Sequence, residues 1–376
     1  MRHICYISGT RADFGLMRST LQSVHAAPDL QLSVVATGMH LSPRYGATVH
    51  EITAAGLAVV AQVPVPLEPA TGAQMARNIA SMLGSFTQEF ERIQPDMVLL
   101  LGDRGEMLAG AIAAIHLNIP IAHIHGGERS GTIDEPVRHA ISKMSHLHFT
   151  ATSEARERLI RMGERADRVF VTGAPGLDGI AEGSTPDREA LLARHGLDAL
   201  RPFALLVLHP VHQEIEQAGA DARAVLAALA ESRMQVLALL PNSDAGNAEV
   251  RKELEDARSK GALALVTHLA RDEFLAAMAV ADLMIGNSSA GIIEAASFGT
   301  PVLNIGRRQN LREHGPNVRH VAAERRAILR GIEELRAHGP FASANIYGDG
   351  HAGERIVRLL RETPLGAELL NKVNGY

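Results

Sequence analysis

Short apolar runs alternate along the chain with longer stretches in which apolar residues recur at helical spacing. The runs are nearly continuous, which is typical of strands buried on both faces of a parallel sheet. In the first half we expect strands at HICYIS (3–8), LSVVAT (32–37), DMVLLLG (96–102), PIAHIH (120–125) and VFVTG (169–173). In the second half we expect them at FALLVL (203–208), QVLALL (235–240), ALALV (262–266), DLMIG (282–286) and PVLNI (301–305).

Helical patterns such as LMRSTLQSVHA (16–26) and EMLAGAIAAIHL (106–117) lie between these strands. Two such series predict an α/β protein with two Rossmann-like domains. The segment GLDGIAEGSTPDRE (176–189) is rich in Gly, Pro and charge and is the predicted boundary. The final helix, ERIVRLLRET (354–363), fits against either domain by its pattern alone.

Composition narrows the class of protein. The 376 residues exceed what one ordinary core holds, and 46% hydrophobic with 21% charged residues describes a globular chain. The net charge of −5 argues against a nucleic-acid surface. Cys5 is the single cysteine, so no disulfide forms within the chain. The sequence shows neither a cleavable signal pattern nor an apolar stretch long enough for a membrane, and we expect a cytoplasmic protein.

Ligands of open α/β sheets bind beyond the carboxyl ends of the strands, so the polar residues just after each strand are the candidates. The first strand runs into SGTRADFGLM (8–17), where Arg11 precedes a helix expected to start near Gly15. A guanidinium beside a helix N-terminus suits a phosphate. The alternative is that Arg11 and Asp13 only cap and pair at this turn. The turn is not a G-x-G-x-x-G fingerprint, which weakens a dinucleotide interpretation.

The strand ending in LLLGDRGEM (99–107) places Asp103 and Arg104 at the same edge. Asp103 is expected to direct its carboxylate into the cleft, or else to cap the following helix, and the two roles are compatible. Arg104 either reaches a ligand or faces solvent.

The stretch IAHIHGGERSGTIDEPVRHA (121–140) crowds acids and bases behind an apolar strand. His123 and His125 share a strand face, but no third ligand stands at a spacing typical of a metal site. Asp134 and Arg138 are four apart, so an intrahelical ion pair would explain them and leave Glu128 unexplained. Carboxylates gathered after adjacent strands suit general acid–base chemistry.

In the second half, His209, Asn242 and His268 each follow a predicted strand. The clearest signal is MIGNSSAGIIEAASFGTPVLNIG (284–306), where Ser288 and Ser289 precede a helix opening near Gly291. Hydroxyls and amides there can hold a diphosphate, with Glu294 placed to accept hydrogen bonds from a ribose. The alternative is two serines that cap the helix. The chain has no D-x-D motif of metal-dependent sugar transferases.

Together these motifs resemble the hydrolysing branch of the UDP-N-acetylglucosamine 2-epimerase family over nearly the whole chain. The similarity runs through GTRADFGLM, GDRGE, HIHGGERSGTIDEPVRHAISKMSHLHF, HPV, LLPNSDAG, GNSSAGIIEAASFGTPVLNIG, RRQ and NIYGDGHAGERI. The tract SGTIDEPVRHAISK, with NIYGDG, also resembles the epimerase domain of the bifunctional animal enzyme.

The resemblance implies a glycosyltransferase-B fold, two Rossmann-like domains facing a central cleft with the last helix returning to the first. The implied limits are 1–180 with 355–376 for the first domain and 181–354 for the second. It assigns the catalytic group to Asp103, Glu128, Asp134 and His209, with Arg138 in support. The implied nucleotide-binding residues are Arg11, Arg104, His209, Asn242, His268, Ser288, Ser289, Gly291, Glu294 and Arg308.

The implied reaction removes UDP across C1–C2 of the sugar to give a 2-acetamidoglucal, and water then adds to leave N-acetylmannosamine for sialic-acid synthesis. A sister branch that acts on UDP-2,4-diacetamido-2,4,6-trideoxyglucose, on the way to legionaminic acid, shares nearly all the motifs. No metal or other cofactor is implied, and a homo-oligomer (dimer or tetramer) is expected, with no nucleic-acid or membrane partner. A metal-independent glycosyltransferase and a non-catalytic sensor of nucleotide sugars are the rival classes. The acids Asp103, Glu128 and Asp134 argue against both.

Overall fold

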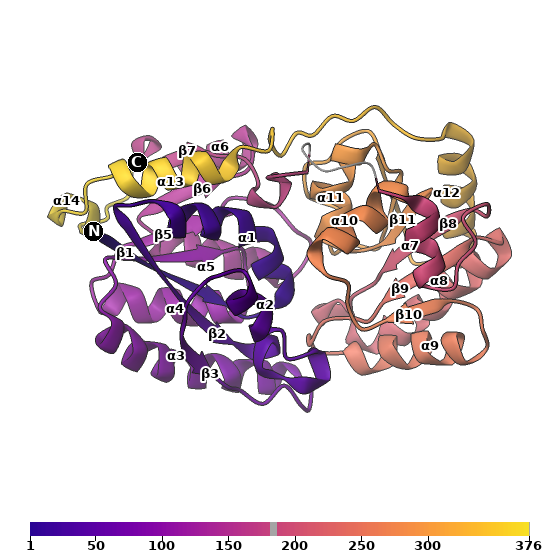
Figure 1. Ribbon diagram of the computed structural model, residues 1–376, viewed down its shortest axis with the longest axis horizontal. Coiled ribbons are helices and arrows are strands. Elements are labelled where there is room, and N and C mark those ends of the chain that lie inside the picture. The colour runs from indigo at the N-terminus through magenta and orange to yellow at the C-terminus, as the bar shows by residue number, and fades with distance from the viewer. Residues whose placement is uncertain (181–185, 376) are drawn as a thin grey trace.

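A computed structural model, which describes residues 1–180 and 186–375, shows two lobes, each built on a parallel sheet (Figure 1). The first sheet has the order β3-β2-β1-β4-β5-β6-β7. Its strands are β1 (Arg2–Ser8), β2 (Leu30–Thr37), β3 (Val59–Val63), β4 (Met97–Leu101), β5 (Ile121–Ile124), β6 (Leu147–Thr150) and β7 (Val169–Val171).

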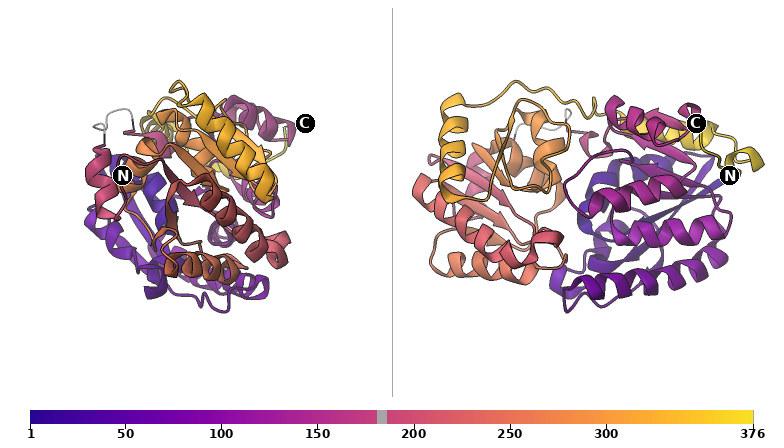
Figure 2. Two further views of the ribbon diagram at one scale, coloured as in Figure 1. Left: turned by 90° about the vertical axis from the view of Figure 1, so that its right-hand side faces the viewer. Right: turned by 180° about the vertical axis from the view of Figure 1, so that it is seen from behind.

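The second sheet has the order β10-β9-β8-β11-β12-β13. Its strands are β8 (Phe203–Val207), β9 (Gln235–Leu239), β10 (Ala264–Val266), β11 (Leu283–Gly286), β12 (Val302–Ile305) and β13 (Val318–Val321). The view from behind again shows the two lobes side by side (right panel of Figure 2). The expected α/β fold with two Rossmann-like domains, of the glycosyltransferase-B type, is confirmed.

Helices cover both faces of each sheet. In the first lobe these are α1 (Arg11–Ala26), α2 (Val49–Ala54), α3 (Gly72–Ile93), α4 (Gly105–His116), α5 (Asp134–Met144) and α6 (Ser153–Arg161). In the second they are α7 (Arg188–Arg194), α8 (Ala218–Ser232), α9 (Asn247–Ser259), α10 (Arg271–Val280), α11 (Ser289–Ile293) and α12 (Arg325–His338). The chain ends in α13 (Ala352–Glu362) and α14 (Ala367–Leu370).

The alternation of side chains along β1 shows why the strands are apolar throughout. Ile4 and Tyr6 pack into a core under α1 and α13, whereas Cys5 and Ile7 pack into a second core under α3 and α4. Since successive side chains point to opposite faces, a strand covered on both sides needs apolar residues at every position.

Three strands of the structure, β3, β6 and β13, were not predicted from the sequence. β3 and β13 are edge strands with partly exposed residues. β13 (VRHV) has no apolar run, whereas the run LAVVA (57–61), which extends into β3, was present in the sequence and was overlooked. β6 is interior but contains His148, which is fully buried and lies 2.9 Å through Nε2 from Oε2 of Glu164. The sequence shows His148 as a polar residue and not as a buried one, so it interrupts the apolar pattern of β6.

The segment that leaves the first lobe after β7 contacts the segment that returns to it before α13. The backbone N–H of Ala174 donates to the carbonyl of Tyr347 (2.8 Å), and that of Gly353 donates to Oδ2 of Asp178 (2.6 Å). The following helix, α13, packs on α1 in the first lobe (Figure 1). Part of the predicted boundary 176–189, residues 181–185, lies outside the described residues, and the exact domain limits stay a prediction.

Candidate active site

A cleft of about 500 Å³ lies between the lobes, where the carboxyl ends of both sheets meet. Most of the residues predicted from the sequence line it: Arg11, Asp103, Arg104, Asp134, His209, Asn242, His268, Ser288, Ser289 and Arg308. The predicted residues that do not line it are Glu128, Arg138, Gly291 and Glu294, all of which are buried beside it.

The turn after β1 is built by a capping box. Asp13 donates its backbone N–H to Oγ1 of Thr10 (3.1 Å), and its carboxylate accepts the N–H of Thr10 (2.6 Å). The helix therefore starts at Arg11, and the expected start near Gly15 is wrong. Asp13 caps as the alternative proposed, but no ion pair joins it to Arg11 among the described contacts. One buried guanidinium nitrogen of Arg11 has no hydrogen-bond partner within residues 1–180 and 186–375, and such a donor suits an anion.

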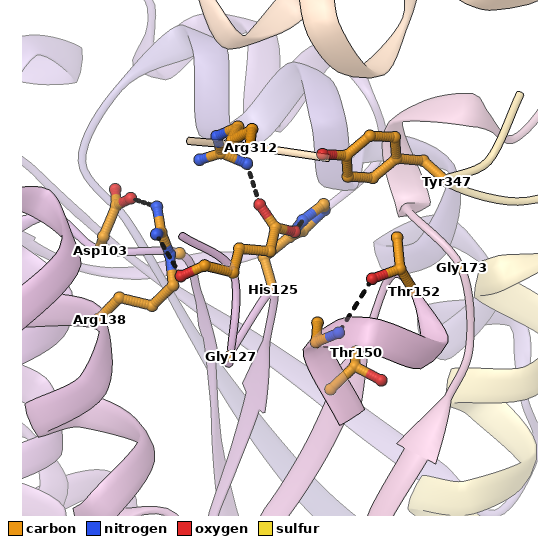
Figure 3. A network of polar contacts seen from close by, with 12 residues as sticks. Asp103, His125, Gly127, Arg138, Thr150, Thr152, Gly173, Arg312 and Tyr347 are labelled. Carbon is orange, nitrogen blue, oxygen red and sulfur yellow. Dashed lines mark hydrogen bonds and ion pairs between the residues drawn. The ribbon is translucent and has the colours of Figure 1, made fainter. Parts of the chain in front are cut away.

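Asp103 follows β4 and forms an ion pair with Arg138 of α5 (Figure 3). It does not cap α4, because the cap residue is Arg104 and no side chain accepts a hydrogen bond there. Arg138 is only 1% exposed, and burial lowers its pKa to about 9. Its second Nη donates to the backbone carbonyl of Glu128 (3.0 Å), which ties the turns after β4 and β5 together.

The intrahelical ion pair, which was the alternative interpretation of Asp134 and Arg138, is not among the described contacts. Asp134 instead lies 3.6 Å through Oδ2 from Nη2 of Arg308, which belongs to the second lobe. Arg308 also donates to the carbonyl of Asn287 (3.1 Å). Asp134 is thus held across the cleft rather than along its own helix.

Glu128 has both carboxylate oxygens engaged and is 3% exposed. Oε1 contacts Nδ1 of His125, and Oε2 forms an ion pair with Arg312 from the second lobe (Figure 3). His125 lines the cleft although Glu128 does not. Burial, reinforced by the charge of Arg312, lowers the pKa of His125 to about 3. The neutral ring donates from Nδ1 to the carboxylate, which leaves Nε2 as a hydrogen-bond acceptor.

His123 and His125 have separate surroundings, so they do not share a ligand. His123 lies 2.7 Å through Nε2 from the carbonyl of Gly102 and 3.0 Å through Nδ1 from Oγ of Ser142. His125 turns away from the strand at φ +61° to reach Glu128. Across the described residues, no group of three or more His, Cys, Asp or Glu side chains is placed to hold a metal ion.

His209 is fixed by the second lobe. Its backbone N–H and carbonyl both bond the Asn287 side chain at 2.8 Å, and Nδ1 accepts the N–H of Asn242 (3.4 Å). Burial and the charge of Arg308 lower the pKa of His209 to about 3. The ring is therefore neutral with its proton on Nε2, where it is free to donate to a ligand.

Asp244, which the sequence analysis missed, joins the two lobes at the cleft floor. Its Oδ1 is 3.3 Å from Nη1 of Arg104, and Oδ2 accepts from Nδ2 of Asn242 (2.6 Å). Desolvation by burial lowers the pKa of the Arg104 guanidinium, but the negative charges of Glu106 and Asp244 have the larger combined effect, so the pKa is raised. The run LLPNSDAG already carried Asp244 in a turn after a strand, which was the signal available.

The turn after β11 supports both interpretations of its serines. Oγ of Ser288 accepts from the N–H of Ala290 (3.3 Å) and caps α11, as the alternative proposed. Ser289 lines the cleft and makes no cap. Gly291 is buried, and a Cβ there would lie 3.0 Å from Cγ1 of Val302, so this glycine has a packing reason. Glu294 is 2% exposed and forms an ion pair with Arg271.

Stability should fall when the pH is lowered from 7 to 5. His123, His125 and His209 have pKa values near 3 in the folded protein, against about 6.5 in an unfolded chain. Between these values the unfolded state binds more protons, so acid favours unfolding, on the order of 1–2 kcal/mol for each histidine at pH 5. Urea unfolding at both pH values measures this. His123→Gln should reduce the difference, and a free energy of unfolding that stays constant would contradict the assignment.

Comparisons with known proteins identify the family of the chain. The profile of the UDP-N-acetylglucosamine 2-epimerase family matches residues 22–361. The chain is 48% identical, over the full length of both, to the hydrolysing UDP-N,N'-diacetylbacillosamine 2-epimerase of Legionella pneumophila. It is 33% identical to a UDP-N-acetylglucosamine 2-epimerase of Neisseria meningitidis, over 93% of this chain and 92% of that one.

Similarity in three dimensions extends over the same length. A solved structure of a UDP-N-acetylglucosamine 2-epimerase from Neisseria meningitidis, bound to UDP-N-acetylglucosamine, matches with a TM-score of 0.81. The two are 20% identical, and the match covers 96% of this chain and 100% of the other. At that identity the likeness shows the fold alone. With the profile and the full-length relatives, the chain belongs to the UDP-N-acetylglucosamine 2-epimerase family.

Proposed function

We propose that this protein is a hydrolysing 2-epimerase and that its substrate is UDP-N,N'-diacetylbacillosamine. This sugar nucleotide is UDP-2,4-diacetamido-2,4,6-trideoxyglucose, the alternative left open by the sequence. The observation that carries the choice is the 48% identity over the full length of both chains to an epimerase of that name. The relative named for UDP-N-acetylglucosamine is 33% identical, which makes that sugar nucleotide the second candidate.

The diphosphate end of the substrate is assigned to the cationic and polar residues of the cleft. Arg11 offers a buried nitrogen without a protein partner among the described residues, and Arg308 and Ser289 line the opposite wall. His209 donates from Nε2 as a neutral ring. These donors stabilise the charge that develops on UDP as the C1–O bond breaks.

The proton transfers are assigned to the first lobe. Asp103 and Asp134 line the cleft, and Glu128 reaches it through His125. One of these bases takes the C2 proton while the C1–O bond electrons leave with UDP, which gives the glucal. Water then adds its hydroxyl to C1, and a proton returns to C2 on the opposite face. Glu128, which the resemblance placed in the catalytic group, is assigned the role of supporting His125.

Incubation without any acceptor tests the function. The protein should release UDP from UDP-N,N'-diacetylbacillosamine and yield the free sugar with C2 inverted. UDP-N-acetylglucosamine should give N-acetylmannosamine more slowly. Both sugar nucleotides remaining intact would contradict the proposal and favour a transferase or a non-catalytic binding protein.

Substitution of the two serines separates capping from ligand binding. Ser289→Ala should weaken UDP binding by roughly 1–3 kcal/mol, because a hydrogen bond to a charged group is lost. Ser288→Ala should also lower the free energy of unfolding by about 1 kcal/mol, because this side chain caps α11. Calorimetry with UDP and thermal unfolding measure the two effects. Unchanged UDP affinity in Ser289→Ala would contradict a role of this turn in UDP binding and leave it only the role of starting α11.

A further inference from the structure

Apolar side chains form one wall of the cleft, on the side of the first lobe. Val65, Leu67, Met75, Ile79 and Val137 all line the cleft and are only half-buried. We call these five residues the apolar wall. Half-buried apolar surface inside a cleft favours a ligand that covers it with apolar groups of its own.

The wall is the open edge of a hydrophobic core. Val65, Ile79 and Val137 pack against the core between the first sheet and helices α3, α4 and α5. On α3, Met75 and Ile79 are four residues apart and share the face directed to the cleft. The positions of Val65, Ile79 and Val137 are therefore set by the packing of the lobe.

The wall borders both carboxylates assigned to the proton transfers. Gly105, two residues after Asp103, has no side chain, and a Cβ there would lie 2.9 Å from Cγ1 and Cδ1 of Ile79. Ile79 thus lies against Gly105, two residues from Asp103 in the chain. Val137 follows Asp134 by three residues on α5, which places the two on neighbouring positions of one helix face.

Two polar side chains beside the wall, Gln74 and Asn78, bond to each other. Asn78 donates from Nδ2 to the carbonyl of Pro66 (2.7 Å), and its Oδ1 accepts from Nε2 of Gln74 (2.8 Å). A sugar hydroxyl placed against the five apolar side chains would lose bonds to water that those side chains cannot replace, which disfavours such a sugar.

We propose that the apolar wall is the subsite for C4 and C6 of the sugar and selects a 6-deoxy sugar nucleotide with an N-acyl group at C4. The inference rests on the proposed function, which places C1 at the diphosphate donors and C2 at the carboxylates. C4 lies across the ring from C1, so C4 and C6 project away from the nucleotide, toward the wall. A C6 methyl and the methyl of a C4 acetamido group are complementary to it, whereas the hydroxyls of N-acetylglucosamine are not.

The test compares kcat/KM for UDP-N,N'-diacetylbacillosamine and UDP-N-acetylglucosamine. The wild-type protein should prefer the first by at least about tenfold. Val137→Thr and Met75→Gln add a polar atom with little change of shape, and each should lower that preference about tenfold. Val60→Thr and Met144→Gln are the matched controls, because they lie at the edge of the same core but outside the cleft. They should leave the preference unchanged.

Binding of both sugar nucleotides, measured by calorimetry, separates this inference from the proposed function. If neither sugar nucleotide is turned over, the proposed function fails. The subsite is still supported in that case if the wild type binds the diacetamido compound more tightly and the wall variants abolish this difference in affinity. Equal kcat/KM and equal affinity for the two compounds in the wild type would overturn the subsite. The same conclusion follows if folded wall variants keep the full preference.

Discussion

Asp103→Asn is expected to lower kcat by about 100-fold or more, while the affinity for UDP changes far less. The substitution keeps the size of the side chain and removes the group that exchanges a proton. Asp103 lines the cleft, and its partner Arg138 is almost fully buried, so the carboxylate is held in one place. Release of UDP gives kcat, and calorimetry gives the dissociation constant.

Asp96→Asn is the matched control because Asp96 directly precedes β4, whereas Asp103 follows it. Its Oδ2 accepts the N–H of His3 (2.7 Å), far from the cleft, so kcat should stay near the wild-type value. Near-normal turnover in Asp103→Asn would remove Asp103 from the catalytic group.

Glu128→Gln should also lower kcat by about 100-fold or more, but by a different route. The carboxylate orients His125 and balances the charge of Arg312, both of them buried. Losing one partner of a buried ion pair is strongly destabilising, so unfolding must be measured beside kcat. A folded variant with full activity would show that His125 needs no carboxylate behind it.

The sequence predicted the residues that follow strands and could not predict their partners. The spacing of Asp134 and Arg138 suggested a local ion pair, yet Asp134 pairs with Arg308 and Arg138 with Asp103. Local spacing says what can meet on one helix, whereas a buried charge is paired by whatever the fold brings to it.

Residues of the second lobe that complete the site of the first were missed for the same reason. Arg312 lies 184 positions after Glu128, and Asp244 lies 140 positions after Arg104. No periodicity connects such positions, so even the place of Asp244 in a turn after a strand could not show that Arg104 would be its partner. The fold was predictable because apolar strands and amphipathic helices are local patterns, but the contacts between the lobes are not.

The largest expected effect is on the product formed in deuterium oxide. If elimination precedes hydration, the C2 hydrogen of the substrate leaves, and the epimerised sugar carries deuterium at C2 in essentially every molecule. The new C1 hydroxyl takes its oxygen from water, because the original C1–O bond has broken. Mass and proton spectra of the product measure the deuterium at C2, with either sugar nucleotide, and a parallel reaction in water enriched in oxygen-18 measures the origin of the C1 oxygen.

The alternatives give different labels. Simple hydrolysis of the sugar nucleotide yields an unlabelled sugar with its C2 configuration retained. A redox route through a C3 ketone needs a nicotinamide, and the turn after β1, held by Thr10 and Asp13, lacks the glycines that usually admit its pyrophosphate. The carboxylates Asp103 and Asp134 beside the cleft suit removal of the C2 proton. Epimerised product without deuterium at C2 would contradict elimination even if the UDP site proved correct.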